Sequence, residues 1–258
     1  MKLLVTNDDG IDSVFLHELI AALTRVGHEL YVVAPATEQS WTGASKTRSR
    51  ALKSHAIDRG FGCPTWTVDG TPSDCVNIAL DHLVPTEVDA VVSGINAGYN
   101  CSIGFVIASG TVAGAWEGAL HGLPALAVSQ DVTEAIYLRL KEPGGGVDEE
   151  LLATIKISAE HAARLAGELL PATPRRSFII HNVNFPYPCR SESVVKRTVP
   201  AQILMPGFFS KADANDLHQL KWTDGEDVSP TEPLTDVRCV AAKHISHTVL
   251  DYRKLGHA

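Results

Sequence analysis

Two adjacent carboxylates near the start of the chain are the residues most suited to chemistry. Residues 2–6 are mostly apolar and have the pattern of a short buried strand, and Asp8 and Asp9 follow after one residue. In an open α/β sheet, ligands bind beyond the carboxyl ends of the strands. Neighbouring carboxylates there repel each other unless a cation lies between them, so the pair indicates a divalent metal site. The structural alternative is a polar turn in which an aspartate caps a helix.

A second predicted strand, residues 88–93, leads into a polar loop over residues 94–100. Small residues over 108–115, including Ser109, Gly110 and Thr111, then begin a predicted helix. Backbone N–H groups at a helix start, with hydroxyl groups beside them, form a binding site for anions. One strand end thus offers carboxylates for a metal and another offers amides and hydroxyls for a phosphate. Together they indicate phosphate-ester chemistry.

These segments resemble the SurE-like survival proteins, a family of metal-dependent nucleotidases and phosphatases. The resemblance covers roughly the first half of the chain, and the second half contains no motif of comparable specificity. Ala108 stands where family members usually have tyrosine, so the resemblance leaves a specialised substrate pocket open. The motifs, in one-letter code, are NDDG at 7–10, AP at 34–35 with QS at 39–40 and glycine at 43, GTPxDCV at 70–76, SGINxGxN at 93–100, SGTV at 109–112, and EG at 117–118 followed by GxPAxAVS at 122–129.

The resemblance implies a metal-binding set of Asp8, Asp9, Ser40 and Asn96. Ser40 follows the predicted strand 30–34 and would add a hydroxyl ligand, and Asn96 would add an amide oxygen. Oxygen-only ligation suits a hard cation, so we expect one Mg²⁺ or Mn²⁺ per subunit. Asp8, Asp9 and Asn96 are also the expected catalytic residues. The sequence leaves open whether either aspartate accepts a proton from the attacking water.

The phosphate is expected to lie against the metal, Asn96 and the turn formed by Ser109, Gly110 and Thr111. A hydrolytic metal there lowers the pKa of water and neutralises charge on the phosphoryl group. Thr111 and its neighbours would contribute hydrogen bonds from the helix start.

Three further residues have both a functional and a structural interpretation. Gly43 either lets the backbone approach the ligand or is an ordinary turn glycine. Asn100 either orients the substrate or caps a loop. Trp41 follows Ser40 in a predicted surface loop, where its indole could stack on a base, although hydrophobic packing is the usual role of tryptophan.

Composition limits the classes of partner and compartment. The 258 residues carry a formal net charge of −8, which argues against binding of nucleic-acid polymers but not against a nucleotide substrate at a metal site. Five cysteines without a C-x-x-C pair predict reduced thiols and a cytoplasmic protein. No apolar run approaches the roughly 20 residues of a membrane helix, so no membrane association is expected.

Alternating strand and helix signals predict an α/β fold: a Rossmann-like, mostly parallel sheet flanked by helices. We divide the chain into a catalytic core over residues 1–186 and a β-rich oligomerisation region with a terminal helix over residues 187–258. A mobile surface loop is expected over residues 142–146. Strands are predicted at 2–6, 30–34, 65–68, 88–93, 125–129, 178–183, 194–199 and 237–245, and helices at 14–26, 73–83, 111–121 and 149–170.

The sequence is most consistent with a divalent-metal-dependent phosphomonoesterase that hydrolyses nucleoside 5′- or 3′-monophosphates to nucleoside and phosphate. One alternative keeps the fold and metal but acts on a specialised phosphate ester or a short polyphosphate. The other is a non-catalytic scaffold that binds a nucleotide or a metal. The family resemblance also implies a homodimer or homotetramer held by the C-terminal region.

Overall fold

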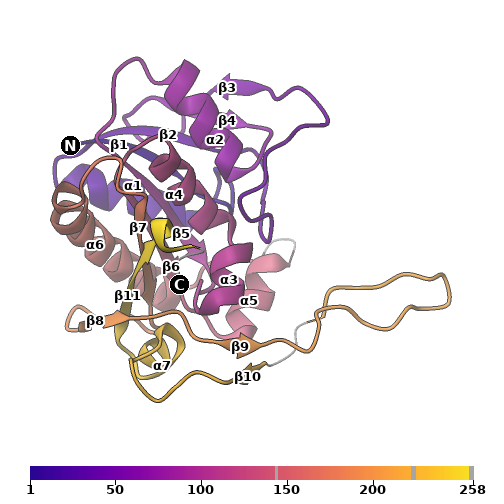
Figure 1. The fold of residues 1–258 in the computed structure, drawn as a ribbon. Coiled ribbons are helices and arrows are strands. Elements are labelled where there is room, and N and C mark those ends of the chain that lie inside the picture. The colour runs from indigo at the N-terminus through magenta and orange to yellow at the C-terminus, as the bar shows by residue number, and fades with distance from the viewer. Residues whose placement is uncertain (143–144, 222–224, 256–258) are drawn as a thin grey trace.

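The centre of the molecule is a mostly parallel sheet (Figure 1). The computed structural model describes residues 1–142, 145–221 and 225–255, and within them the sheet has nine strands in the order β3-β4-β2-β1-β5-β6-β7-β11-β8. The strands are β1 (Lys2–Thr6), β2 (Glu29–Pro35), β3 (Ser54–Ala56), β4 (Thr65–Val68), β5 (Ala90–Ala97), β6 (Ala125–Gln130), β7 (Ile179–Phe185), β8 (Val195–Thr198) and β11 (Ile245–Asp251); β9 (Ile203–Leu204) and β10 (Glu226–Asp227) form a separate pair.

The inner strands are parallel, which confirms the predicted α/β class. Val5 of β1 pairs with Val32 of β2 on one side and Val92 of β5 on the other. The strands β6 and β7 continue this parallel set, whereas the pairs β3–β4 and β7–β11 of the sheet are antiparallel. The carboxyl ends of β1, β2, β5, β6 and β7 therefore lie along one edge of the sheet.

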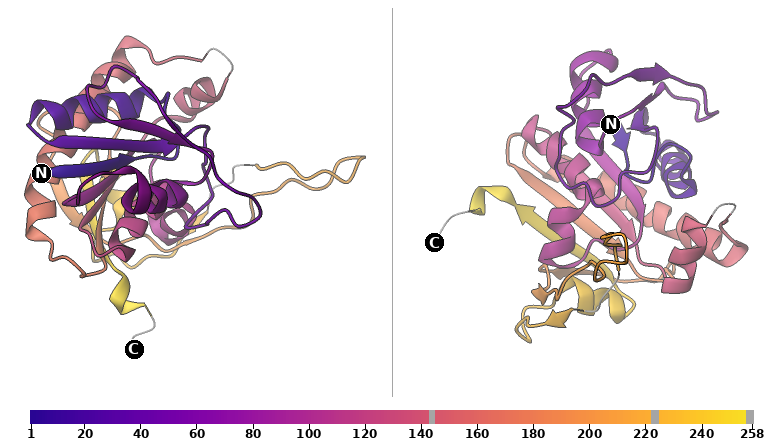
Figure 2. Two further views of the ribbon diagram at one scale, coloured as in Figure 1. Left: turned by 90° about the horizontal axis from the view of Figure 1, so that it is seen from above. Right: turned by 90° about the vertical axis from the view of Figure 1, so that its right-hand side faces the viewer.

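Helices cover both faces of the sheet (Figures 1 and 2). Leu3 and Val5 belong to the hydrophobic cluster with α1 and α6, whereas Leu4 belongs to the cluster with α2 and α4. This division follows from the strand geometry, because successive side chains point to opposite faces. The helices are α1 (Val14–Arg25), α2 (Pro72–Ile78), α3 (Ser102–Ala108), α4 (Gly110–Leu120), α5 (Glu134–Lys141), α6 (Glu149–Ala172) and α7 (Asp236–Ala241), with a π-helical turn at Ala79–Leu83 and a 3₁₀ turn at Tyr252–Lys254.

Three local predictions differ from the structure. The strand predicted over 237–245 is wrong, because Thr235 caps the helix α7 and β11 begins only at Ile245. Strand β5 runs to Ala97 rather than ending at 93. The short helices α3 and α5 were not predicted. Of the loop expected over 142–146, residues 143–144 lie outside the described part of the chain.

The C-terminal region both extends the sheet and leaves it. Strand β11 pairs with β7, and β8 adds to β11, so this part continues the core sheet. Residues 205–221, which we call the arm, project from the body beside β9 and β10 (Figures 1 and 2). A division of the chain at residue 186 stays a prediction.

Two findings concern helix length and cysteines. Within the described residues, no single helix has the length and apolar character needed to cross a membrane; α3 and α4 reach them only as a pair bent by 68°. All five cysteines have free thiols.

Candidate active site

The turn after β1 places Asp8 and Asp9 at the carboxyl edge of the sheet. The side-chain amide of Asn7 closes this turn by donating a 2.8 Å hydrogen bond to the carbonyl oxygen of Gly10. Gly10 has a φ of +93°, which glycine adopts without steric strain. The carbonyl oxygen of Asp8 accepts a 2.7 Å hydrogen bond from the N–H of Gln39. This bond brings the loop after β2 next to the two carboxylates.

Both carboxylates resist ionisation. Burial raises the pKa of Asp8 to about 6, although the hydrogen bond from Thr111 lowers it in part. Burial and the charge of Asp8 together raise the pKa of Asp9 to about 8. A divalent cation between the two groups would offset both the lost hydration and the mutual repulsion. The electrostatics of the pair therefore fit a metal.

Each aspartate has one oxygen held by the protein. Asp8 Oδ1 accepts a 2.6 Å hydrogen bond from Thr111 Oγ1, and Asp9 Oδ2 accepts a 2.8 Å hydrogen bond from the N–H of Ala97. These bonds orient the carboxylates and leave the second oxygen of each for a ligand. Within the described residues, no group of three or more histidine, cysteine, aspartate or glutamate side chains is placed to hold a metal ion. A site at this position would use two carboxylates with neutral oxygen ligands, a donor set that suits a hard cation.

Ser40 lies in the loop after β2 and is oriented by a charged pair. Its hydroxyl donates a 2.7 Å hydrogen bond to Glu38 Oε1, and Glu38 forms an ion pair with Lys141 of α5. Although burial raises the pKa of Glu38, the hydrogen bonds from Lys141 and Ser40 hold it below its usual value. Lys141 also lowers the pKa of Asp8 and Asp9 through its charge. The sequence analysis missed Lys141, because α5 was not predicted.

Asn96 lies within β5 rather than after it. The register between β5 and β6 shifts between Ser93 and Asn96, and Gly94 has a φ of +131° at this point. A side chain at residue 94 would be blocked, because its Cβ would lie 2.2 Å from the carbonyl oxygen of Val128. The amide nitrogen of Asn96 donates a 2.6 Å hydrogen bond to the carbonyl oxygen of Gly98. Its amide oxygen is then the atom available to a cation.

The start of α4 packs directly against Asp8. Ser109 caps the helix by accepting a 3.0 Å hydrogen bond from the N–H of Val112. A Cβ on Gly110 would lie 2.8 Å from the Cβ of Asp8, so only glycine permits this approach. The N–H groups of Gly110 and Thr111 belong to the first helical turn, where backbone donors have no partner within the helix. An anion at this end would be favoured by those donors and by the helix dipole.

A cavity of about 800 Å³ joins several of these groups. Asp8, Ser40 and Asn96 line it together with Asn100 and Ser109. Asp9, Gly110 and Thr111 are not in its lining, but Asp9 and Thr111 are hydrogen-bonded to residues at its edge. The structure therefore brings three of the four expected metal residues and part of the expected phosphate turn to one opening, with Asp9 next to it.

Two expected substrate residues have structural contacts in this fold. Gly43 donates a 2.9 Å hydrogen bond to the carbonyl oxygen of Ala108 and does not line the cavity. Asn100 lines the cavity, but its side chain donates a 2.8 Å hydrogen bond to Ser129 and its N–H donates to Asn184 at 2.7 Å. Asn184, which accepts this bond, was not expected from the sequence. It lies near the end of β7 on the same sheet edge, and that position is the sequence signal that could have identified Asn184.

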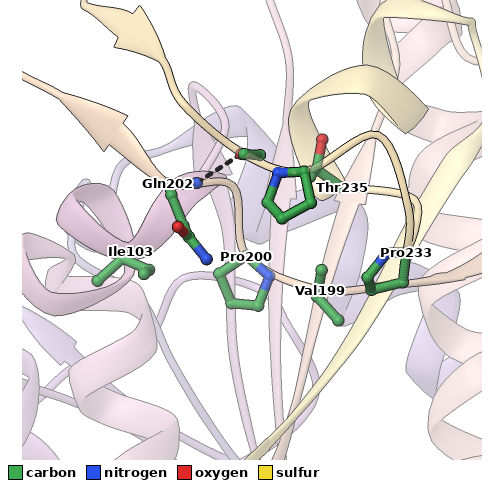
Figure 3. A pocket seen from close by; sticks show the side chains of 8 residues that line it. Ile103, Val199, Pro200, Gln202, Pro233 and Thr235 are labelled. Carbon is green, nitrogen blue, oxygen red and sulfur yellow. Dashed lines mark hydrogen bonds between the residues drawn. The ribbon is translucent and has the colours of Figure 1, made fainter.

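A second cavity of about 380 Å³ lies near the base of the arm (Figure 3). Prolines and small polar residues line it, and none of the lining residues carries a charge. The backbone N–H of Gln202 donates a 2.8 Å hydrogen bond to Ser229 beside it (Figure 3). This cavity lacks the carboxylates of the first one, so the candidate chemistry belongs to the larger cavity.

Comparisons with known proteins agree with one another on the family of this chain. The family model described as "Survival protein SurE" matches residues 3–204. The chain is 34% identical to the 5′-nucleotidase SurE of Desulforudis audaxviator, over 96% of this chain and 90% of that protein. It is also 34% identical to the 5′-nucleotidase SurE of Trichormus variabilis, over 98% and 93% of the two chains. The crystal structure of the SurE protein from Aquifex aeolicus matches with a TM-score of 0.72 and 28% identity, over 97% of this chain and 93% of that one. Since the family model spans most of the chain and these relatives match almost its full length, the chain belongs to the SurE survival protein family.

Proposed function

We propose that this protein is a divalent-metal-dependent nucleotidase, a phosphoric monoester hydrolase that releases phosphate from nucleoside monophosphates. The observation that carries the proposal is the pair of adjacent carboxylates, Asp8 and Asp9, whose pKa values are both raised, next to the first turn of α4. The similarity to relatives named 5′-nucleotidase supports the same reaction and favours 5′-monophosphates over 3′-monophosphates.

We assign metal binding and phosphate binding to two different groups of residues at the cavity. Asp8 and Asp9, with Ser40 and Asn96 as neutral donors, would hold one Mg²⁺ or Mn²⁺ ion. The ion, when bound, supplies positive charge against the phosphoryl group and lowers the pKa of the attacking water. Asn96 lines the same cavity as Asp8 and Ser109, so its amide would contact the phosphate as well as the metal.

The helix side would bind the phosphate oxygens. The N–H groups of Gly110 and Thr111 lie at the positive end of the α4 dipole, and the Ser109 hydroxyl lines the cavity beside them. No histidine is among the residues that line the cavity, so a carboxylate is the group suited to accept a proton from water. Asp8 and Asp131 both line the cavity and are candidates for that role.

The test is release of inorganic phosphate from purified protein. Nucleoside 5′- and 3′-monophosphates, sugar phosphates and short polyphosphate are compared with Mg²⁺, with Mn²⁺ and with a chelator. We expect the nucleoside 5′-monophosphates to be hydrolysed best and the chelator to abolish turnover. Equal or better hydrolysis of another ester or of polyphosphate would favour the specialised phosphatase. Nucleotide or metal binding without phosphate release would favour a non-catalytic scaffold.

We further propose that the protein is a cytoplasmic homodimer or homotetramer that does not bind nucleic-acid polymers or membranes. The net charge of −8 and the five free thiols support this environment. Apolar side chains on the arm and beside it, such as Leu204 at 59% and Phe209 at 69% exposure, support assembly through the C-terminal region.

A further inference from the structure

One wall of the 800 Å³ cavity is aromatic. Trp41, Phe105 and Phe208 all line it, and they come from the loop after β2, from α3 and from the arm. The ring centroids of Trp41 and Phe105 are 5.4 Å apart, and those of Trp41 and Phe208 are 5.3 Å apart. The indole of Trp41 is therefore the centre of a cluster that joins three separate segments.

The backbone of Trp41 is held in a conformation that packing alone does not explain. Its φ is +64°, in the left-handed region that a bulky residue rarely adopts. Its side chain remains 40% exposed, so burial offsets only part of the strain. Strained residues of this kind concentrate at ligand sites, where the surrounding structure keeps them in place. Trp41 also directly follows Ser40, so its indole lies close to the expected metal site.

The same cavity also carries the groups of the proposed phosphate chemistry. Asp8, Asn96 and Ser109 line it together with the aromatic cluster, and the total volume lies within the range of pockets that bind small ligands and cofactors. A ligand that fills the cavity would therefore combine an anionic group with a flat apolar group. A nucleoside monophosphate has both.

We propose that Trp41, together with Phe105 and Phe208, forms a stacking platform for the nucleobase of the substrate. This inference rests on the proposed nucleotidase function and adds how the base is recognised and that the arm contributes a wall of the site. Stacking uses the π-face that every base possesses, so it selects nucleotides over other phosphate esters but discriminates little between bases. Stacking should strengthen the binding of purine nucleotides more than that of pyrimidine nucleotides, because the larger purine ring buries more surface area.

The competing explanation is that the aromatic cluster only fastens the arm to the body. The chain offers a matched pair to separate the two: Phe208 lines the cavity and contacts Trp41, whereas its neighbour Phe209 is 69% exposed and does not line the cavity. Phe208→Ala and Phe209→Ala both remove a ring from the arm, and only the first removes one from the platform.

The experiment compares kcat/KM for AMP with kcat/KM for ribose 5-phosphate, which carries the same phosphate and sugar without a base. We expect Trp41→Ala and Phe208→Ala to lower the ratio of the two values by about tenfold, the size of one stacking contact. Trp41→Phe, which keeps a ring at the same position, should restore most of the ratio. Phe209→Ala should leave the ratio at the wild-type value.

Adenosine binding by equilibrium dialysis gives a readout that needs neither turnover nor metal. Wild type should bind adenosine, and Trp41→Ala should lower the affinity by about tenfold. An unchanged adenosine affinity in Trp41→Ala, or equal ratios for the two phenylalanine variants, would overturn the platform while leaving the proposed function standing. Absence of hydrolysis of both phosphates by the wild type would contradict the proposed function, and loss of adenosine binding in Trp41→Ala would still support the platform.

Discussion

Thr111 donates a 2.6 Å hydrogen bond to Asp8 and so joins two residues that lie 103 positions apart in the sequence. Thr111 belongs to the first turn of α4, and Asp8 follows β1. Both side chains are almost completely buried. The bond couples the carboxylate side of the site to the helix end that we propose binds the phosphate, because movement of either element would break it.

Thr111→Val should weaken metal binding without unfolding the protein. The substitution keeps the shape of the side chain and removes the donor that holds Asp8 Oδ1. Loss of a partner that orients a metal ligand typically lowers metal affinity by about 10- to 100-fold. Thr111→Ser retains the hydroxyl and should restore most of the affinity. Isothermal titration with Mn²⁺ measures this, and equal affinities for the valine variant and the wild type would contradict the coupling.

Asp8→Asn and Asp9→Asn should each abolish turnover while the fold persists. Each substitution removes a charge that a divalent ion requires, so we expect a loss on the order of a hundredfold or more. Phosphate release measures activity, and circular dichroism with thermal unfolding checks the fold. Near-normal metal-dependent activity in both variants would refute the metal assignment.

The apo protein should lose stability relative to Asp9→Asn as the pH rises. The folded-state pKa of Asp9 is raised to about 8 and that of Asp8 to about 6, above the ordinary aspartate value of 3.8. Between about pH 4 and 8 the folded state therefore binds more protons than the unfolded state, so a rising pH favours unfolding. Urea unfolding in the presence of a chelator, at pH 5.5 and at pH 8, measures this. From the lower to the higher pH, the free energy of unfolding of the wild type should decrease relative to that of Asp9→Asn.

Divalent metal is the control for this pH effect. Because the ion stabilises both ionised carboxylates, saturating Mn²⁺ should remove the loss of wild-type stability at pH 8. A difference between wild type and Asp9→Asn that stays constant from pH 5.5 to 8 in chelator would show that Asp9 ionises normally.

Asn96→Ala and Asn100→Ala should affect different properties. Asn96 lines the cavity and its amide oxygen is the proposed metal ligand, so its loss should lower kcat/KM by tenfold or more with little change in stability. Asn100 is buried in a hydrogen-bond network with Ser129 and Asn184, so its loss should lower the free energy of unfolding by about 1–3 kcal/mol. Kinetics and chemical unfolding of both variants separate these effects. If both variants are fully folded and Asn100→Ala loses more activity than Asn96→Ala, then Asn100 and not Asn96 is the residue that acts in the site.

The arm should hold the protein in an oligomer. Leu204 and Phe209 are mostly exposed in the single chain, and such apolar surface is typical of an assembly contact. Light scattering at concentrations down to well below micromolar should detect at least a dimer in the wild type. Removal of residues 205–221 should give a monomer, whereas a monomeric wild type at every concentration would exclude the arm as an obligate contact.

The core strands could be predicted from the sequence because their residues are buried on both faces. β1, β2 and β6 are mostly apolar, and Thr71 with Asp74 forms the capping box that begins α2. The helix α5 was missed, since it is only eight residues long and none of them is buried. β5 was predicted too short because the register shift at Gly94 is set by the neighbouring strand β6.

The sequence alone determined the α/β class and the identity of the reactive groups, because hydrophobic periodicity and the types of adjacent side chains are local properties. The tertiary structure decided how those groups are used. The hydroxyl of Thr111 donates a hydrogen bond to Asp8, and Asn100 belongs to a buried network. Lys141 and the arm reach the site from segments far away in the sequence. Such contacts depend on how strands and loops meet at the sheet edge, and no local pattern encodes that meeting.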